Sequence, residues 1–274
     1  MSKRQISVAA LQTSFGVDIK ANIAKIEKLV RQAAKAGANV ILPPELFQGP
    51  YFCTEQNPKW FETAYPAKSH PCVVAMQKLA RTLKVVIPVS IFEKDGPRYY
   101  NSVVIVDSDG EALGLYRKSH IPDGPGYQEK YYFRPGDTGF KVWETKFGTI
   151  GVGICWDQWY PECARAMVLQ GADILFYPTA IGSEPYDKVL DTHRRWQRVM
   201  QGHAVANAAP VIAANRIGLE KVGGNAQRFY GHSFIADHTG EIVAGFGDAD
   251  EGVLTHTFDL DAIEAYRADW GFFR

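Results

Sequence analysis

Three residues whose side chains could act together on a carbonyl group each follow a short apolar run. They are Cys155 after residues 149–154, Glu45 after residues 39–44 and Lys118 after residues 111–117. A thiol is a nucleophile, a carboxylate can take its proton, and an ammonium group can stabilise a developing oxyanion. Because sites in open α/β sheets lie at the carboxyl ends of strands, we predict that these side chains meet and attack an amide-like carbonyl.

Each of these residues also has a simpler interpretation. Cys155 could be a small buried hydrophobic residue, Glu45 a solvated loop acid and Lys118 a surface cation. The sequence after Cys155 favours a displayed nucleophile, since Pro161 and Glu162 suit the first turn of a helix. Backbone N–H groups near such a turn can face an oxyanion beside the thiol.

The elements that would position these residues alternate between helix and strand, which is typical of α/β architecture. Apolar spacing and end signals predict a helix at residues 18–36 and another from Pro161 to near Gly171. A further helix is predicted to begin near Ser69, with Leu79 and Leu83 on its buried face. Strands are predicted within residues 1–12, at residues 174–178 and at residues 211–215.

Two pairs of segments resemble each other and occur in the same order along the chain. Residues 37–44 resemble 171–178, and residues 105–111 resemble 235–241, with hairpin turns at 107–110 and 237–240. We therefore predict a pseudo-symmetric sandwich of two related halves. The positions that match Glu45 and Lys118 are Thr179 and Asp248, so one half alone carries the catalytic charges.

Composition limits the class of protein. The 274 residues include 30 basic and 30 acidic side chains, so no net field attracts nucleic acid or an anionic membrane. No linker or charge block divides the chain, and we expect one domain over residues 1–274. The apolar run at the amino terminus is too short for a signal peptide. Four cysteines without a paired motif suit a reducing compartment, so we expect a cytoplasmic protein.

Other motifs do not predict a cofactor or a metal. The glycines in residues 148–153 have the wrong spacing for a nucleotide fingerprint, and the seven histidines show no zinc-ligand pairing. His120 is expected to make a structural hydrogen bond. We interpret Cys53, Cys72 and Cys163 as packing residues. The cluster of Arg194, Arg195 and Arg198 is interpreted as a subunit interface or the solvated face of a helix.

The surroundings of the three reactive residues resemble the carbon–nitrogen hydrolase (nitrilase) superfamily over nearly the whole chain. The matching motifs are Pro-Pro-Glu-Leu-Phe at Glu45, Tyr-Arg-Lys-Ser-His-Ile-Pro at Lys118 and Gly-Ile-Cys-Trp-Asp at Cys155. Longer similar segments are residues 120–130, 155–159 and 176–185. The resemblance implies a four-layer α-β-β-α sandwich that forms a homodimer or a larger homo-oligomer. Similar proteins carry an Arg/Pro-rich tail beyond the position of residues 271–274.

The resemblance also implies roles for individual residues. Glu45 is expected to be the general base, and Lys118 with the backbone N–H of Trp156 the oxyanion donors. Glu129 is implied as a second catalytic glutamate that orients Lys118 or the attacking water. Its alternative is a solvated acid paired with Lys130.

Within the superfamily the chain resembles N-carbamoylputrescine amidohydrolases in particular, which implies a small ureido-amine substrate. Relatives that act on ureido acids commonly place arginines just after the nucleophile, where this chain has Gln158 and Trp159. Acidic residues that could hold an amine tail are Asp123 and Glu184, although Glu184 could instead cap a helix. The other expected substrate-binding residues are Tyr51, Trp156 and Ser183. Alternatives are an N-carbamoyl-β-alanine or aliphatic amide hydrolase and a catalytically silent scaffold.

Overall fold

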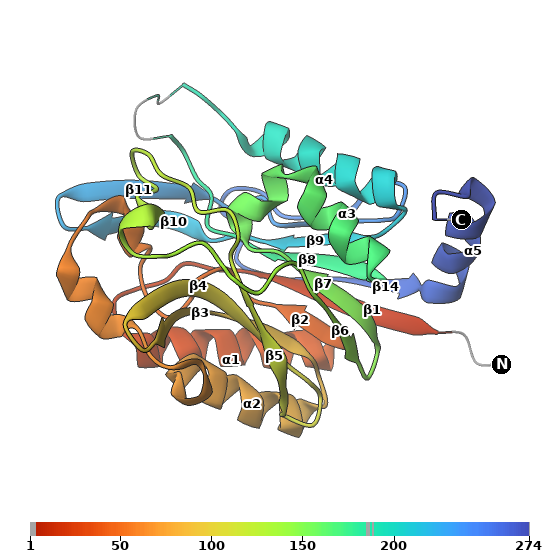
Figure 1. Ribbon diagram of the computed structural model, residues 1–274, viewed down its shortest axis with the longest axis horizontal. Helices are drawn as coiled ribbons and strands as arrows, with labels where there is room; N and C mark the ends of the chain where they lie inside the picture. Colours follow the sequence, from red (N-terminus) through yellow and green to blue (C-terminus); the bar gives the residue numbers. More distant parts are fainter. Residues whose placement is uncertain (1–3, 185–186, 188, 274) are drawn as a thin grey trace.

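The computed structural model describes residues 4–184, 187 and 189–273 (Figure 1). Its strands are β1 (Gln5–Gln12), β2 (Val40–Leu42), β3 (Ile87–Asp95), β4 (Arg98–Val106), β5 (Ala112–Arg117), β6 (Val142–Thr145), β7 (Gly148–Val152), β8 (Ile174–Pro178), β9 (Val211–Ala214), β10 (Ile217–Val222), β11 (Asn225–Tyr230), β12 (Phe234–Ala236), β13 (Ile242–Gly245) and β14 (Gly252–Asp259). Its α-helices are α1 (Ile19–Lys35), α2 (Pro71–Leu83), α3 (Pro161–Leu169), α4 (His193–Asn207) and α5 (Leu260–Trp270). Pro185, the last residue of one predicted motif, lies outside the described residues.

The strands form two layers of similar order. One sheet has the order β13-β12-β9-β8-β7-β6. In the other layer β14-β1-β2 is continued by β3-β4-β5, since Val40 forms a parallel bridge with Val86 and the Ile41 N–H donates to Val86 O at 2.9 Å. The central β7-β8-β9 and β1-β2 pairings are parallel, as expected for strands separated by helical crossovers.

The two sheets pack face to face and helices cover their outer faces (Figure 1). Along β1, Val8 and Ala10 belong to the core between the sheets, whereas Ala9 and Leu11 belong to the core under α1 and α2. This alternation follows from the two-residue period of a strand. Helices α3 and α4 cover the second sheet in the same way. The predicted α-β-β-α sandwich is confirmed.

The internal repeat is also confirmed, because the two predicted hairpins are built alike. The Asp107 N–H donates to Glu111 O at 2.8 Å, and the Asp237 N–H donates to Glu241 O at 2.9 Å. Each hairpin shifts register at the residue before its turn, in β4–β5 and in β12–β13. Thr179, the counterpart of Glu45, lies beside it, since the Glu45 N–H donates to Thr179 O at 3.4 Å.

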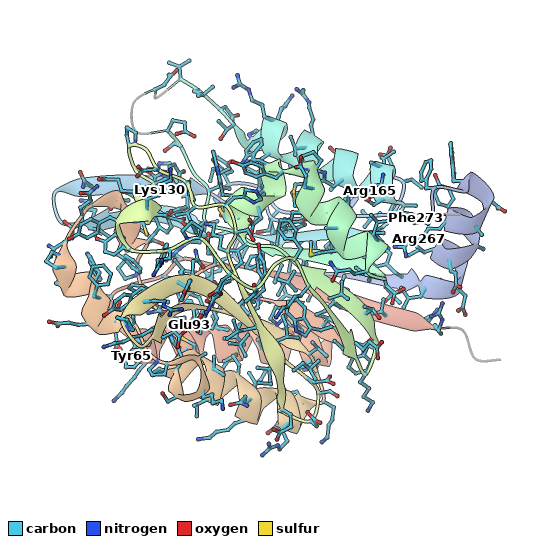
Figure 2. All side chains as sticks on the ribbon, in the orientation of Figure 1. Tyr65, Glu93, Lys130, Arg165, Arg267 and Phe273 are labelled. Carbon is cyan, nitrogen blue, oxygen red and sulfur yellow. The ribbon has the colours of Figure 1, made fainter. Side chains whose placement is uncertain are left out.

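The elements that the sequence analysis did not predict include the β10–β11 hairpin and the carboxyl-terminal helix α5. Arg267 of α5 donates to Ala208 O at 2.8 Å and to Asp173 O at 3.0 Å. The Arg165 guanidinium of α3 lies 5.3 Å from the centre of the Phe273 ring (Figure 2). This contact holds the residues that follow α5 against the helical layer.

Candidate active site

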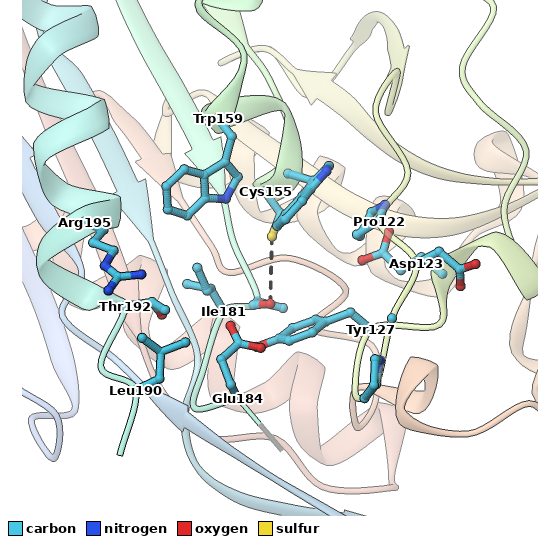
Figure 3. A pocket seen from close by; sticks show the side chains of 15 residues that line it. Pro122, Asp123, Tyr127, Cys155, Trp159, Ile181, Glu184, Leu190, Thr192 and Arg195 are labelled. Carbon is cyan, nitrogen blue, oxygen red and sulfur yellow. Dashed lines mark hydrogen bonds between the residues drawn. The ribbon is translucent and has the colours of Figure 1, made fainter. Parts of the chain in front are cut away.

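Cys155 lies on a sharp turn at the end of β7. Its φ of +42° lies in the left-handed region that non-glycine residues rarely adopt. A short 3₁₀ helix, Cys155–Trp159, comes first, and α3 then begins at Pro161 as predicted. Cys155 as a whole residue is 5% exposed, and its thiol lies 3.8 Å from Ala180 O, to which it donates (Figure 3). The turn thus presents the sulfur at the edge of the sheet with little access to bulk water.

Lys118 lies between two carboxylates. Its Nζ is 3.0 Å from Glu45 Oε1, 3.0 Å from Glu129 Oε1 and 2.7 Å from Glu129 Oε2. All three side chains are 0% exposed. The solvated-acid and surface-cation interpretations of Glu45 and Lys118 are therefore wrong, because neither group reaches water. A buried charge of this kind is tolerated only when it is paired and hydrogen-bonded.

The two carboxylate oxygens of Glu45 differ in their hydrogen bonds. Oε1 accepts from Asn101 Nδ2 at 2.7 Å as well as from Lys118. Oε2 is buried and has no hydrogen-bond partner among the described residues. Such an atom can accept a proton without first losing another hydrogen bond.

Glu129 is held from two sides. Besides the Lys118 contacts, Oε1 accepts a 2.6 Å hydrogen bond from Tyr51. Lys130 is exposed at the surface (Figure 2), so the alternative pairing of Glu129 with Lys130 is wrong. Tyr51 is itself fully buried against Tyr127 and Phe229. The structure places it behind Glu129, not along the substrate cavity where we expected it, because its hydroxyl is used by the carboxylate.

The charges of this cluster oppose a preformed thiolate. Burial raises the pKa of Cys155 well above its ordinary value, the Glu45 carboxylate raises it further, and Lys118 lowers it by less. Burial alone would lower the pKa of Lys118, but the carboxylates of Glu129 and Glu45 together raise it well above its ordinary value. Burial likewise raises the pKa of Glu129 against the opposing effect of Lys118. Lys118 is thus a fixed cation, and Cys155 is a thiol until its proton is removed.

Asp157 joins the turn at Cys155 to the loop that follows Lys118. Its Oδ2 accepts from the Ile154 N–H at 3.0 Å and from Tyr116 at 2.8 Å. Its Oδ1 accepts from the His120 N–H at 3.0 Å and lies 2.8 Å from His120 Nδ1. The His120 ring stacks on Tyr160 at 3.6 Å. His120 is therefore structural, as expected, and the sequence did not reveal the role of Asp157.

A cavity of about 510 Å³ opens beside Cys155 and Glu129 (Figure 3). Three of the expected substrate-binding residues line it, namely Asp123, Trp156 and Glu184. Ser183 is not among the lining residues. Its N–H and its hydroxyl both donate to Arg228 O on the neighbouring hairpin, at 2.8 and 3.3 Å. Glu184 does not cap a helix, since the residue before α4 is Thr192.

Arg195, Thr192 and Trp159 are among the lining residues that the sequence analysis did not assign to the site. Arg195 was interpreted as part of a subunit interface or of the solvated face of a helix. It is exposed, and it also lines the cavity together with Thr192, one helical turn before it. Trp159 was noted only for replacing an arginine, and its indole lies beside Cys155 (Figure 3). The spacing of three residues between Thr192 and Arg195 was a signal that both share one helix face.

The described residues contain no group of three His, Cys, Asp or Glu side chains that could hold a metal ion. No helix in residues 4–184, 187 and 189–273 is long and apolar enough to cross a membrane. The four cysteines are free and buried.

Known proteins match this chain over nearly its full length. The Arabidopsis thaliana N-carbamoylputrescine amidase is 59% identical, over 99% of this chain and 92% of the relative. A Francisella tularensis citrullinase is 51% identical, over 98% of this chain and 94% of the relative. The crystal structure of a carbon-nitrogen hydrolase from Helicobacter pylori superposes with a TM-score of 0.91 at 39% identity, covering 98% and 94% of the two chains. The carbon-nitrogen hydrolase family model matches residues 7–268, and this chain belongs to that family.

Proposed function

We propose that this hydrolase converts N-carbamoylputrescine and water to putrescine, carbon dioxide and ammonia, a reaction of polyamine synthesis. The relatives named as N-carbamoylputrescine amidases support this substrate through their high identity and coverage. The observation that carries the chemistry is the buried Lys118 ammonium, which lies between two carboxylates beside the only cysteine that lines the cavity in the described part of the chain.

In this proposal Glu45 removes the Cys155 proton as the sulfur attacks the ureido carbon. The proton goes to Oε2, the oxygen that has no hydrogen-bond partner among the described residues. Proton removal and attack occur together, because the raised pKa of Cys155 disfavours a free thiolate. Negative charge then develops on the ureido oxygen. Lys118 and the backbone N–H of Trp156 stabilise this charge, and Glu129 holds Lys118 in position.

The intermediate collapses when its C–NH₂ bond breaks, and the nitrogen leaves as ammonia with the proton that Glu45 received. An N-alkylcarbamoyl thioester remains on Cys155. Glu45 next takes a proton from water, whose oxygen attacks the thioester carbon, and the C–S bond breaks to restore the thiol. The released N-alkylcarbamic acid loses carbon dioxide to give putrescine. One water is consumed and the atoms balance.

Recognition of the amine tail is proposed to rest on Glu184, with Asp123 at the other side of the cavity (Figure 3). An ammonium group that enters the cavity and loses part of its hydration needs an acidic partner to replace it. The Trp156 side chain is 37% exposed and can cover the methylene chain. The acids favour a cationic tail over the carboxylate tail of N-carbamoyl-β-alanine.

The proposal is tested by measuring ammonia and putrescine from N-carbamoylputrescine, with N-carbamoyl-β-alanine as the competing substrate. The native chain is compared with Cys155→Ala and with Cys72→Ala, a matched control on α2 far from the cavity. We expect turnover of the amine substrate that only Cys155→Ala abolishes. Preference for the acid would overturn the tail assignment, and inactivity on both would favour an aliphatic amidase or a silent scaffold.

We also propose that the chain works as a single hydrolase domain in the cytoplasm and assembles as a homodimer or a larger homo-oligomer through its helical layers. Exposed apolar side chains on α3 and α4 support such an assembly, since Leu169 is 66% exposed and Val205 is 50% exposed. Sedimentation analysis of the native chain and of Val205→Glu tests it, and a native monomer would contradict it.

A further inference from the structure

A buried ion pair outside the cavity borders the segment that carries Glu45. Arg216 directly precedes β10 and Glu220 lies within it. The Arg216 Nη2 lies 2.9 Å from Glu220 Oε1, its Nε donates to the same oxygen at 3.0 Å, and the two side chains are 0% and 4% exposed. Neither residue lines the cavity beside Cys155. Because a buried ion pair is often no more stabilising than apolar residues of similar volume, stability alone does not explain this one.

Arg216 uses its other donors on the backbone at and after Glu45. Its Nη2 donates to Gly49 O at 2.6 Å, and its Nη1 donates to Glu45 O at 3.5 Å. The guanidinium also lies over the rings of Phe15 and Phe229, 4.8 and 5.3 Å from their centres. A planar cation that is hydrogen-bonded along its edges and packed on aromatic rings has little freedom to move. The carbonyl groups of residues 45 and 49 are therefore bound to one fixed cation.

Glu220 binds the far end of the same segment. Its Oε2 accepts a 2.6 Å hydrogen bond from the Tyr51 N–H. The Tyr51 hydroxyl in turn donates to Glu129 at 2.6 Å, so Glu220 acts on the second glutamate through Tyr51. The ion pair thus contacts the backbone of Glu45 on one side and the hydrogen-bond partner of Glu129 on the other.

The segment needs these contacts because its own backbone is irregular. Residues 43–51 form no helix or strand. Leu46, directly after Glu45, has a φ of +48°, in the left-handed region that non-glycine residues rarely adopt. Such a conformation persists only where the surrounding structure determines it. Arg216 and Glu220 supply hydrogen bonds to the backbone of residues 45, 49 and 51, on both sides of Leu46.

We propose that Arg216 and Glu220 are positioning residues for the hydrolytic reaction. Through these contacts they set where the carboxylates of Glu45 and Glu129 lie relative to the Lys118 ammonium. The inference rests on the roles that the proposed function gives to these carboxylates. Loss of the pair should slow the chemical step and leave substrate binding nearly unchanged, because neither residue of the pair lines the cavity.

The first experiment separates positioning from stability, with ammonia release from N-carbamoylputrescine and thermal melting measured at pH 8. Arg216→Met leaves the Glu220 carboxylate buried without its cation, so the melting temperature should fall by about 10 °C. The double variant Arg216→Met/Glu220→Leu also removes the carboxylate and should regain most of that loss. Its kcat, measured well below its melting temperature, should stay at least ~10-fold below the native value with KM within about 2-fold, because small misplacements of a reacting group are costly.

The second experiment follows the connection to Glu129. A Gln side chain has one acceptor oxygen, so Glu220→Gln cannot accept from both Arg216 and the Tyr51 N–H. The hydrogen bond from Tyr51 lowers the pKa of Glu129, and a weaker bond should therefore move the acid limb of kcat/KM to higher pH. In a Tyr51→Phe background the same change should not move the limb further, because the connecting hydrogen bond is already absent.

Arg267→Gln is the matched control. Arg267 is half-buried and donates to backbone carbonyl groups as Arg216 does, but it belongs to α5 and does not line the cavity. This variant should melt at a lower temperature and keep the native kcat and pH profile.

Recovery of kcat together with the melting temperature in the double variant would show that the pair acts on stability alone and would overturn the inference. An acid limb that Glu220→Gln leaves in place, or moves equally in both backgrounds, would refute the action through Tyr51. Inactivity of the native chain on N-carbamoylputrescine would instead contradict the proposed function, and the same variants assayed on an aliphatic amide would then decide the role of the pair.

Discussion

Tyr51 donates a 2.6 Å hydrogen bond to Glu129, 78 residues further along the chain, and both side chains are fully buried. The phenol supplies Glu129 with a donor that carries no charge, so Lys118 remains free to face Glu45 as well. This contact supports the charged form of Glu129, because a donor to a carboxylate lowers its pKa.

Tyr51→Phe should therefore raise the pKa of Glu129 further. A carboxylate with a higher pKa takes up its proton at a higher pH, so the acid limb of kcat/KM should move upward by about one pH unit. KM should change little, since Tyr51 does not line the cavity. The pH–rate profile checks this. Tyr132→Phe, in the same aromatic cluster, is the control, and an unshifted limb in Tyr51→Phe would contradict the role given to Tyr51.

Lys118→Met should reduce kcat at least ~100-fold, because the oxyanion loses a charged donor. It also leaves buried carboxylates without their cation, which should lower the free energy of unfolding by about 3–5 kcal/mol. Loss of Lys118 raises the pKa of Glu129 in the folded state, so the folded variant binds protons more readily than the unfolded chain. The variant's stability should fall as pH rises.

Thermal melting at pH 5 and at pH 8 tests the stability of Lys118→Met. The deficit against the native chain should be larger at pH 8. Lys130→Met removes an exposed lysine close in sequence and should melt like the native chain at both values. A deficit in Lys118→Met that does not vary with pH would show that lost packing, not charge, explains the change.

Asp157→Asn should weaken catalysis without touching the cavity. An amide has one acceptor oxygen, so Asn cannot accept from Ile154, Tyr116 and His120 together. We expect a loss of about 2 kcal/mol in stability and at least ~10-fold in kcat. Asp173→Asn is the control, because Asp173 accepts from the Thr149 N–H at the opposite end of β7. Native kcat in Asp157→Asn would refute the positioning role.

The reactivity of Cys155 should depend on pH in a way that reports its proton. Burial and Glu45 raise the pKa of this thiol. Inactivation by a neutral alkylating reagent should therefore accelerate steadily above pH 9 and show no plateau near pH 7. The rate of inactivation is measured against pH with and without substrate. Mass spectrometry of the cysteine peptides then shows which cysteine is alkylated. A plateau near pH 7 would mean that Lys118 outweighs Glu45 and that a thiolate exists before substrate binds.

The sequence alone indicated the reacting groups and many of the elements, although not the β10–β11 hairpin or α5. Strand and helix periods reveal which face of one element is buried, and prolines and turn residues mark where elements end. Glu45, Lys118 and Cys155 could be found because each directly follows such an apolar run. The repeated segments predicted the two related halves, because the same turn chemistry occurs twice.

The tertiary structure decided which distant side chains share one space. The contact of Tyr51 with Glu129, the hydrogen bonds of Asp157 and the place of Arg195 on the cavity depend on how the two sheets and their helices pack. No local pattern carries that information, since periodicity sets a residue's direction within its own element only. The relation between elements follows from the close packing of the whole sandwich.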